Sequence, residues 1–159
     1  MIDFVFRSIA IGIGATVLLD LWGLLLNRVF GVPMANWGMV GRWFSHLPSG
    51  RVFHDDIGSA RPYPHELVVG WIGHYLVGIL FAVILLALAP AGWASRPTFL
   101  PALIVGLVTV GAGWFLLQPG MGAGIAASKR PNAWQIRFLN VVGHIVFGLG
   151  LYGTALIIR

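Results

Sequence analysis

The chain has 159 residues, of which 58% are hydrophobic and only 9% are charged. A soluble domain carries about 25% charged residues, so a surface that faces water throughout is excluded. The formal net charge is +5, and the ten Lys and Arg residues are dispersed without a basic run, so nucleic-acid binding is not expected. The absence of cysteine excludes disulfides, thiolate metal sites and cysteine nucleophiles.

Four apolar stretches are long enough to cross a bilayer as helices, which takes about 20 residues each. Backbone groups must be hydrogen-bonded within lipid, and the alternation typical of a membrane barrel is absent, so helices are expected rather than strands. The sequence therefore predicts an all-α, polytopic membrane protein in the lipid bilayer, built as a four-transmembrane-helix bundle in a single domain. The predicted spans are residues 8–26, 67–89, 98–117 and 138–158, and a long polar loop covers residues 27–66.

The distribution of basic residues predicts the orientation of these spans. Four spans place both termini and the turn at residues 90–97 on the same side of the membrane, and that side carries three basic residues. The loops at residues 27–66 and 118–137 lie on the other side and carry seven. Because Lys and Arg accumulate in cytoplasmic loops, we expect the two long loops to be cytoplasmic and both termini to be outside.

Both long loops contain patterned segments. Residues 36–47 carry apolar residues, including Trp37 and Trp43, at helical spacing. This segment is expected to be either a short interfacial helix, with Trp at the headgroup level, or a loop packed over the mouth of the bundle. The glycine-rich segment after Gln118 and Pro119 is either re-entrant or a loose loop.

An internal repeat is suggested by two matching segments. Residues 73–78 and residues 143–148 both read G-H-x-x-x-G, and they fall in the second and fourth spans. We therefore expect two helical hairpins related by a pseudo-two-fold axis along the membrane normal. Glycine-rich helix faces allow close packing within one chain, or between chains in a homo-oligomer.

Three ionisable residues are expected to meet inside the bundle: Asp20, His74 and His144. Each shares a helix face with small residues, which favours a position on the packed side of its span. Each is seven or eight residues from the loop-bearing end of its span, which corresponds to a common depth of about 10–12 Å. An ionisable group at a helix centre costs about 2.5–3.5 kcal/mol on insertion scales, so such residues usually have a partner and a purpose.

The leading hypothesis is a divalent metal site near the cytoplasmic side, formed by Asp20, His74 and His144. Two imidazoles and a carboxylate suit Fe, Mn or Zn, with positions left open for water or substrate. The loop residues His54 and Asp56, together with Gln118, are candidates for additional ligands. Copper(I) is less favoured because the chain has no cysteine.

Three alternatives stay open. In the first, His74 and His144 are axial ligands of haem b, since they lie at matched depth on two helices. In the second, Asp20 and the histidines form a proton or ion path. In the third, the protein is a non-catalytic assembly or accessory protein whose buried polar residues only clamp helices together. No catalytic residue is assigned, and the sequence leaves open whether the protein is an enzyme.

Six segments resemble a family of short bacterial inner-membrane proteins catalogued as domain of unknown function 2938. The most distinctive is QPGMGAGIAASKRPN, and the resemblance covers nearly the whole chain. It implies a four-helix protein of the bacterial inner membrane, with the termini then periplasmic, but it implies no activity. The segments are residues 11–22, 40–57, 70–79, 101–110, 118–132 and 143–153, with family motif positions at Asp20, His46, His54, His74, Gln118, Asn132 and His144.

Overall fold

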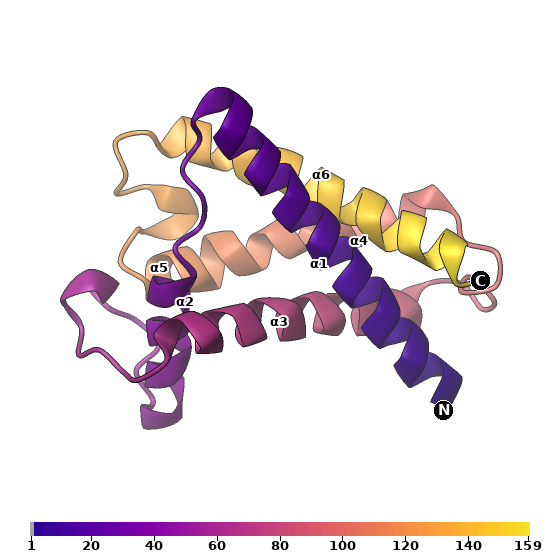
Figure 1. The fold of residues 1–159 in the computed structure, drawn as a ribbon, viewed down its shortest axis with the longest axis horizontal. Helices are drawn as coiled ribbons and strands as arrows, with labels where there is room; N and C mark the ends of the chain where they lie inside the picture. Colours follow the sequence, from indigo (N-terminus) through magenta and orange to yellow (C-terminus); the bar gives the residue numbers. More distant parts are fainter. Residues whose placement is uncertain (1) are drawn as a thin grey trace. The chain divides into compact units, whose positions relative to one another are not determined.

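The computed structural model describes residues 2–159, and within them all regular secondary structure is helical (Figure 1). Four helices are long and apolar enough to cross a membrane: Ile2–Phe30 (α1), Glu66–Leu88 (α3), Phe99–Gly120 and Ala133–Ile157 (α6). The predicted all-α fold with four spans is thus confirmed. Helices α1 and α6 extend beyond the predicted spans because helical hydrogen bonding continues into the more polar flanks, where hydropathy no longer marks the helix.

The third span is not a uniform helix. It consists of Phe99–Ala112 (α4), a π-helical turn at Gly113–Leu117 (η3) and Gln118–Gly120 (α5). Pro119 lacks an N–H and its ring crowds the carbonyl four residues earlier, so regular α-helical bonding fails there. The turn widens instead, and the Gln118 N–H donates to the carbonyl of Gly113, five residues back.

Short helices form the ordered parts of the long loops. They are Trp37–His46 (α2), Leu47–Ser49 (η1), Ile57–Ser59 (η2) and Ile125–Ala127 (η4). The predicted short helix near Trp37 is therefore confirmed. It begins where the Asn36 side chain accepts a hydrogen bond from the Met39 N–H, an N-cap of the usual kind.

The chain divides into two compact units. The first unit comprises the chain up to Met34 together with Tyr75–Thr109 and Val141–Arg159. The second unit comprises Ala35–His74 and Val110–Asn140, so it contains most of the two long loops and the adjoining helix ends. The expectation of a single domain stays a prediction.

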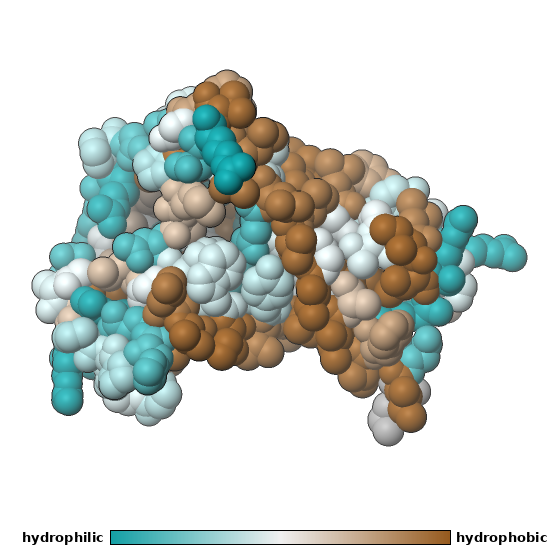
Figure 2. Space-filling view, viewed as in Figure 1, coloured by the Kyte–Doolittle hydropathy of each residue, from teal (hydrophilic) through white to brown (hydrophobic). Residues whose placement is uncertain are grey.

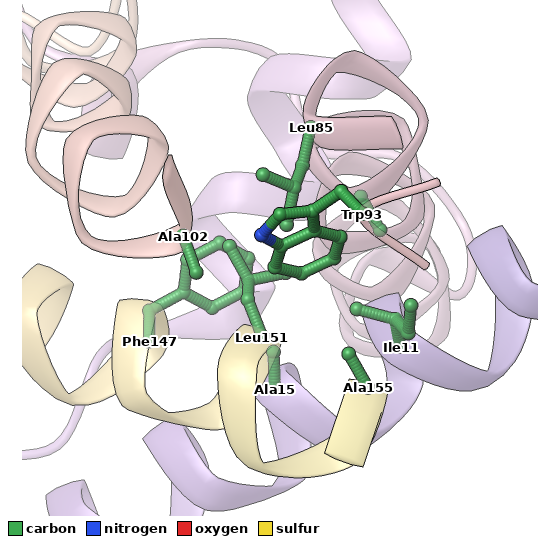
Figure 3. Packing of buried hydrophobic residues seen from close by; sticks show 9 residues of the cluster. Ile11, Ala15, Leu85, Trp93, Ala102, Phe147, Leu151 and Ala155 are labelled. Atoms are coloured by element: carbon green, nitrogen blue, oxygen red, sulfur yellow. The ribbon is translucent and has the colours of Figure 1, made fainter. Parts of the chain in front are cut away.

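Small residues bring the helix backbones of the first unit close together. A Cβ atom on Gly12 would lie 2.5 Å from Cα of Ile79, and one on Gly150 would lie 2.6 Å from Cα of Ala15. The apolar core beside these approaches joins α1, α3, α4, α6 and the turn between α3 and α4 (Figure 3). Its labelled members are Ile11, Ala15, Leu85, Trp93, Ala102, Phe147, Leu151 and Ala155.

Arg7 ties α1 to two other segments of the first unit. Its Nη1 donates to the carbonyls of Ala94 and Ile158, each at 3.1 Å. Its Nε donates to the carboxylate of Asp3, whose side chain is 74% exposed. The three segments that meet here are the first turns of α1, the turn after α3 and the residue after α6.

Most of the apolar helix surface is left uncovered by protein. In the most apolar window of each spanning helix, only 17% to 33% of the residues are buried. Figure 2 shows this apolar surface as a brown band along α1. A surface of this kind is stable only in lipid, so the fold is that of a multi-pass membrane protein.

The structure does not support the internal repeat. Gly73 faces the ring of Phe44 and His74 stacks on Trp37, whereas the equivalent His144 bonds to the backbone of α4. The two G-H-x-x-x-G segments therefore have unlike surroundings. A short shared pattern in a glycine-rich chain reflects the general need for small residues at helix contacts.

Alanine at Gly106 is expected to destabilise the first unit. Its Cβ would lie 2.6 Å from the carbonyl oxygen of His144 and 2.9 Å from Cα of Gly148, both backbone atoms that cannot rotate away. Overpacking of this kind costs roughly 1–3 kcal/mol, so Gly106→Ala should lower the thermal unfolding midpoint of the purified protein. Gly153→Ala is the matched control, because a Cβ there meets no atom within 4 Å. Equal midpoints for the two variants would contradict the close approach.

Candidate functional site

Helix α2 packs directly on the first turns of α3. A Cβ on Gly41 would overlap the carbonyl of Glu66, and a Cβ on Gly70 would overlap the carbonyl of Trp37. Only glycine at both positions lets the two helices approach this closely. The segment is thus a helix, as the first of the two interpretations expected, and it packs against α3; a position at the lipid headgroups stays a prediction.

Arg42 holds the loop after α2 to α3. Its Nε and Nη2 donate to the two carboxylate oxygens of Glu66, at 2.7 and 3.1 Å. Its Nη1 donates to three loop carbonyls, those of Ile57, Gly58 and Ala60, at 3.0–3.3 Å. The hydrogen bond to Glu66 raises the pKa of Arg42 above its ordinary value, while burial acts in the opposite direction. The guanidinium thus remains charged and orders the loop.

The two long loops are joined to each other within the second unit. The His54 N–H donates to the carbonyl of Gly120 at 3.0 Å, and the Ile57 N–H donates to that of Met121 at 3.2 Å. Gly120 has no room for a side chain, since its Cβ would lie 2.5 Å from the indole nitrogen of Trp43. The glycine-rich segment is therefore closely packed rather than loose.

Two histidines lie together in this joined region. The rings of His46 and His54 meet edge to face, with centroids 4.8 Å apart. His46 is only 2% exposed, and its Nε2 is 2.9 Å from the carbonyl of Arg61. His54 Nδ1 is 3.0 Å from the carbonyl of Gly120. A carbonyl only accepts hydrogen bonds, so each of these nitrogens carries the proton.

The other nitrogen of each ring is buried without a partner. Within residues 2–159, four buried side-chain polar atoms lack a hydrogen bond, and two of them are His46 Nδ1 and His54 Nε2. In the neutral ring these two atoms are lone-pair acceptors. Metal-binding histidines show the same arrangement, in which one nitrogen donates to a carbonyl and the other faces the metal.

Gln118 provides a third unpartnered acceptor in the second unit. Its Nε2 donates to Asn140 Oδ1 at 2.8 Å, and the indole of Trp114 donates to the same oxygen at 3.1 Å. Gln118 Oε1 is buried without a partner. The π-helical turn spans Trp114 and ends just before Gln118, and both of these side chains reach the same oxygen of Asn140.

The three residues of the predicted intramembrane site have other neighbours. Asp20 Oδ2 accepts a hydrogen bond from the Tyr75 hydroxyl at 3.0 Å. His144 Nδ1 donates to the carbonyl of Gly106 at 3.0 Å and lies 3.1 Å from the Thr109 hydroxyl. His74 stacks on Trp37 with ring centroids 3.9 Å apart.

The predicted ligand group of Asp20, His74 and His144 stays a prediction that the structure does not support. In the part of the chain that the structure describes, no three His, Asp or Glu side chains gather into a group able to hold a metal ion. The contacts given above engage each of the three predicted residues with protein groups. The Asp56 carboxylate, a suggested additional ligand, instead caps η2 by accepting from the Gly58 N–H at 2.9 Å.

His46 is not among the ligands that the sequence predicted, although it is a motif position of the resembled family. One signal for it was available. His46 lies three residues after Trp43 and six after Val40, on the face of α2 that is buried. A histidine on the buried face of a short amphipathic helix needs a polar partner, and here that partner is a loop carbonyl.

The fold and the site define an α-helical multi-pass membrane protein with an ordered polar unit formed largely by its loops. The chain belongs to the family described as Protein of unknown function (DUF2938), whose model matches residues 9–158. The family resemblance seen in the sequence is thus confirmed. Searches of the curated proteins and of the solved structures gave no match.

Removing the charge of Glu66 is expected to destabilise the second unit. The Arg42 and Glu66 side chains are only 12% and 14% exposed, so Glu66→Gln leaves a largely buried guanidinium without its counter-charge. Loss of one partner of a buried pair costs on the order of 3 kcal/mol. Asp3→Asn makes the same change in an exposed pair and should cost less than about 1 kcal/mol. Thermal unfolding of both variants measures the difference, and equal losses would refute the role of Arg42.

Proposed function

We propose that this membrane protein binds a transition metal ion in its second unit, with His46 Nδ1 and His54 Nε2 as ligands. The observation that carries the proposal is the pair of buried, unpartnered ring nitrogens on rings 4.8 Å apart. Imidazole nitrogen is a ligand for zinc, copper, iron and nickel. The sequence predicted a metal, and this proposal keeps that function but changes the ligands.

Backbone carbonyls supply the supporting contacts that such a site needs. Arg61 and Gly120 each accept the proton of one ring, which selects the tautomer and orients the lone pair of the other nitrogen. Removing such supporting contacts in metalloproteins typically weakens metal binding by about 10–100-fold. The two ring orientations are therefore set by backbone carbonyl oxygens, which a substitution of the Arg61 or Gly120 side chain does not remove.

An ordered water molecule is the competing occupant. Buried waters commonly satisfy polar atoms that have no protein partner, and a water beside either ring would donate to its free lone pair. The two occupants differ in chemistry, because a water adds no metal to the purified protein. Elemental analysis therefore separates them.

A second proposal concerns the spans, where the polar residues are helix clamps, as in an assembly or accessory protein. His144 on α6 donates to the Gly106 carbonyl of α4, and Tyr75 on α3 donates to Asp20 on α1. Each bond joins two helices that lipid alone does not hold together. This role needs no ligand and is compatible with a metal in the second unit.

The haem b and ion-path alternatives stay predictions. Haem b would require His74 and His144 as axial ligands, and a Soret absorption band in the purified protein would select it. An ion path would use Asp20 with the same histidines. A homo-oligomer also remains an expectation.

We further propose that the protein lies in a bacterial inner membrane with both termini in the periplasm. The support is the charge distribution, three basic residues on the side of the termini against seven in the long loops. The metal site would then face the cytoplasm.

Elemental analysis of the purified protein should find about one transition metal ion per chain. His46→Gln and His54→Asn are the informative variants, because each replacement amide keeps a donor near the original carbonyl bond and removes only the proposed ligand nitrogen. We expect both variants to lose the metal while remaining folded.

His144→Ala is the control for these variants. It removes a bond between two helices, so its unfolding temperature should fall while its metal content stays at the wild-type level. The proposal is refuted if the wild-type protein holds no metal, or if His46→Gln and His54→Asn retain it.

Single cysteines test the orientation, since the natural chain has none. Ser95→Cys lies in the turn between α3 and α4, and Ser128→Cys lies in the loop before α6; both positions are exposed. In intact cells a membrane-impermeant maleimide should label the first variant and reach the second only after permeabilisation. The reverse pattern would invert the proposed topology.

A further inference from the structure

We infer that a cavity at the start of α1 binds one phospholipid with a phosphoethanolamine headgroup, a function separate from the metal binding proposed above. The cavity has a volume of about 150 Å³ and lies between the first turns of α1, the last turn of α3 and the turn that follows α3. All three segments belong to the first unit. Among the described residues that line the cavity, Asp3 and Arg7 carry charge, and the walls are otherwise apolar.

The cavity lies at the level expected for lipid headgroups. Arg7 directly precedes the first predicted span, which begins at residue 8, and the second predicted span ends at residue 89, which also lines the cavity. The surface around it is apolar and uncovered by protein, since Phe4 on the cavity wall is 40% exposed and Leu88 is 77% exposed. A phospholipid held here therefore has its headgroup at Arg7 and its acyl chains on the apolar helix surface.

Arg7 has donors to spare for a phosphate. Guanidinium carries five N–H groups, of which Nε uses one on Asp3 and Nη1 uses two on the carbonyls of Ala94 and Ile158. Within residues 2–159 nothing accepts from Nη2, and this atom is not among the buried unpartnered ones, so it is accessible. The other two nitrogens fix the guanidinium in place. The two Nη2 hydrogens are thus preorganised for an anionic oxygen, and phosphate is a preferred partner of arginine.

Asp3 determines which phospholipid fits. Its carboxylate accepts from Arg7 Nε at 2.8 and 3.0 Å, yet its side chain is 74% exposed, so lone pairs remain for a further donor. The two side chains present one positive and one negative charge, which complements a headgroup made of a phosphate and a primary ammonium. Phosphatidylglycerol brings no cation for Asp3, and the trimethylammonium group of phosphatidylcholine has no N–H to donate to it.

The size of the cavity agrees with this arrangement. A cavity of about 150 Å³ in another protein holds benzene, which has about six heavy atoms. The cavity beside Arg7 therefore has room for a phosphate group but not for a whole headgroup. The ammonium then lies at the open side, where the exposed carboxylate of Asp3 can accept its hydrogen bond.

Native mass spectrometry of the delipidated full chain in detergent micelles tests the inference. The protein is titrated with phosphatidylethanolamine, phosphatidylglycerol and phosphatidylcholine that carry identical acyl chains. We expect one phosphatidylethanolamine per chain, bound roughly fivefold more tightly than the other two lipids, the size of effect that a solvent-exposed ion pair gives. The protein has a net charge of +5, so unspecific attraction would favour phosphatidylglycerol instead.

Two variants assign the headgroup to its partners. Asp3→Asn should abolish the preference for phosphatidylethanolamine over phosphatidylglycerol, because the ammonium loses its carboxylate. Arg7→Gln should weaken all three lipids roughly tenfold, because the charged donors to phosphate are lost. Arg96→Gln is the matched control, since it removes an exposed arginine of the same turn that does not line the cavity. It should bind lipids as the wild type does.

The inference is overturned if the wild type binds phosphatidylglycerol as tightly as phosphatidylethanolamine, or if Asp3→Asn keeps the preference. Equal weakening by Arg96→Gln and Arg7→Gln also overturns it, because the lipids would then respond only to the overall charge. Arg7→Gln loses the bonds to Ala94 and Ile158 as well, and it could unfold for that reason. Asp3→Asn keeps those bonds, so its lipid preference decides the question in either case.

Discussion

The second unit depends on side-chain donors that satisfy the carbonyl groups of irregular backbone. An irregular loop lacks the regular backbone-to-backbone hydrogen bonds of a helix or sheet. A buried carbonyl without a donor lowers the stability of the fold by roughly 1–3 kcal/mol. Helix α2 supplies donors from one short stretch: Arg42 to Gly58, Trp43 to Val52 and His46 to Arg61. These bonds hold the loop after α2 in place, so a helix of ten residues organises a segment about twice its length.

This constraint also creates the candidate site. His46 and His54 are used as donors to loop carbonyls, and that use leaves the second nitrogen of each ring as an acceptor. Because both rings are held in one region, the structural task of satisfying carbonyls leaves two unpartnered acceptor nitrogens there. The intramembrane histidine His144 shows how the same chemistry serves a clamp: its Nδ1 bonds to the carbonyl of Gly106, and the bond joins two helices.

Hydropathy predicted the spans well because a membrane helix is recognised from the length and apolar character of one run of consecutive residues. The π-helical turn before Gln118 was missed, since Pro119 disturbs a helix in several ways and only the packed structure selects one. The repeat finds no support in the structure because its matching glycines meet different groups: a Cβ on Gly73 would overlap the ring of Phe44, while one on Gly143 would meet only the Leu19 side chain, at 3.4 Å. A shared spacing does not distinguish these surroundings.

The sequence by itself determined the class of the protein, because composition decides which solvent the surface requires and 58% hydrophobic residues require lipid. It also identified the polar residue types from which any site must be built. Only the tertiary structure decided which histidines are paired. His46 and His54 owe their tautomers to carbonyls 15 and 66 residues away in the chain. Contacts at that separation depend on how the loops fold back, and no local pattern of residues encodes them.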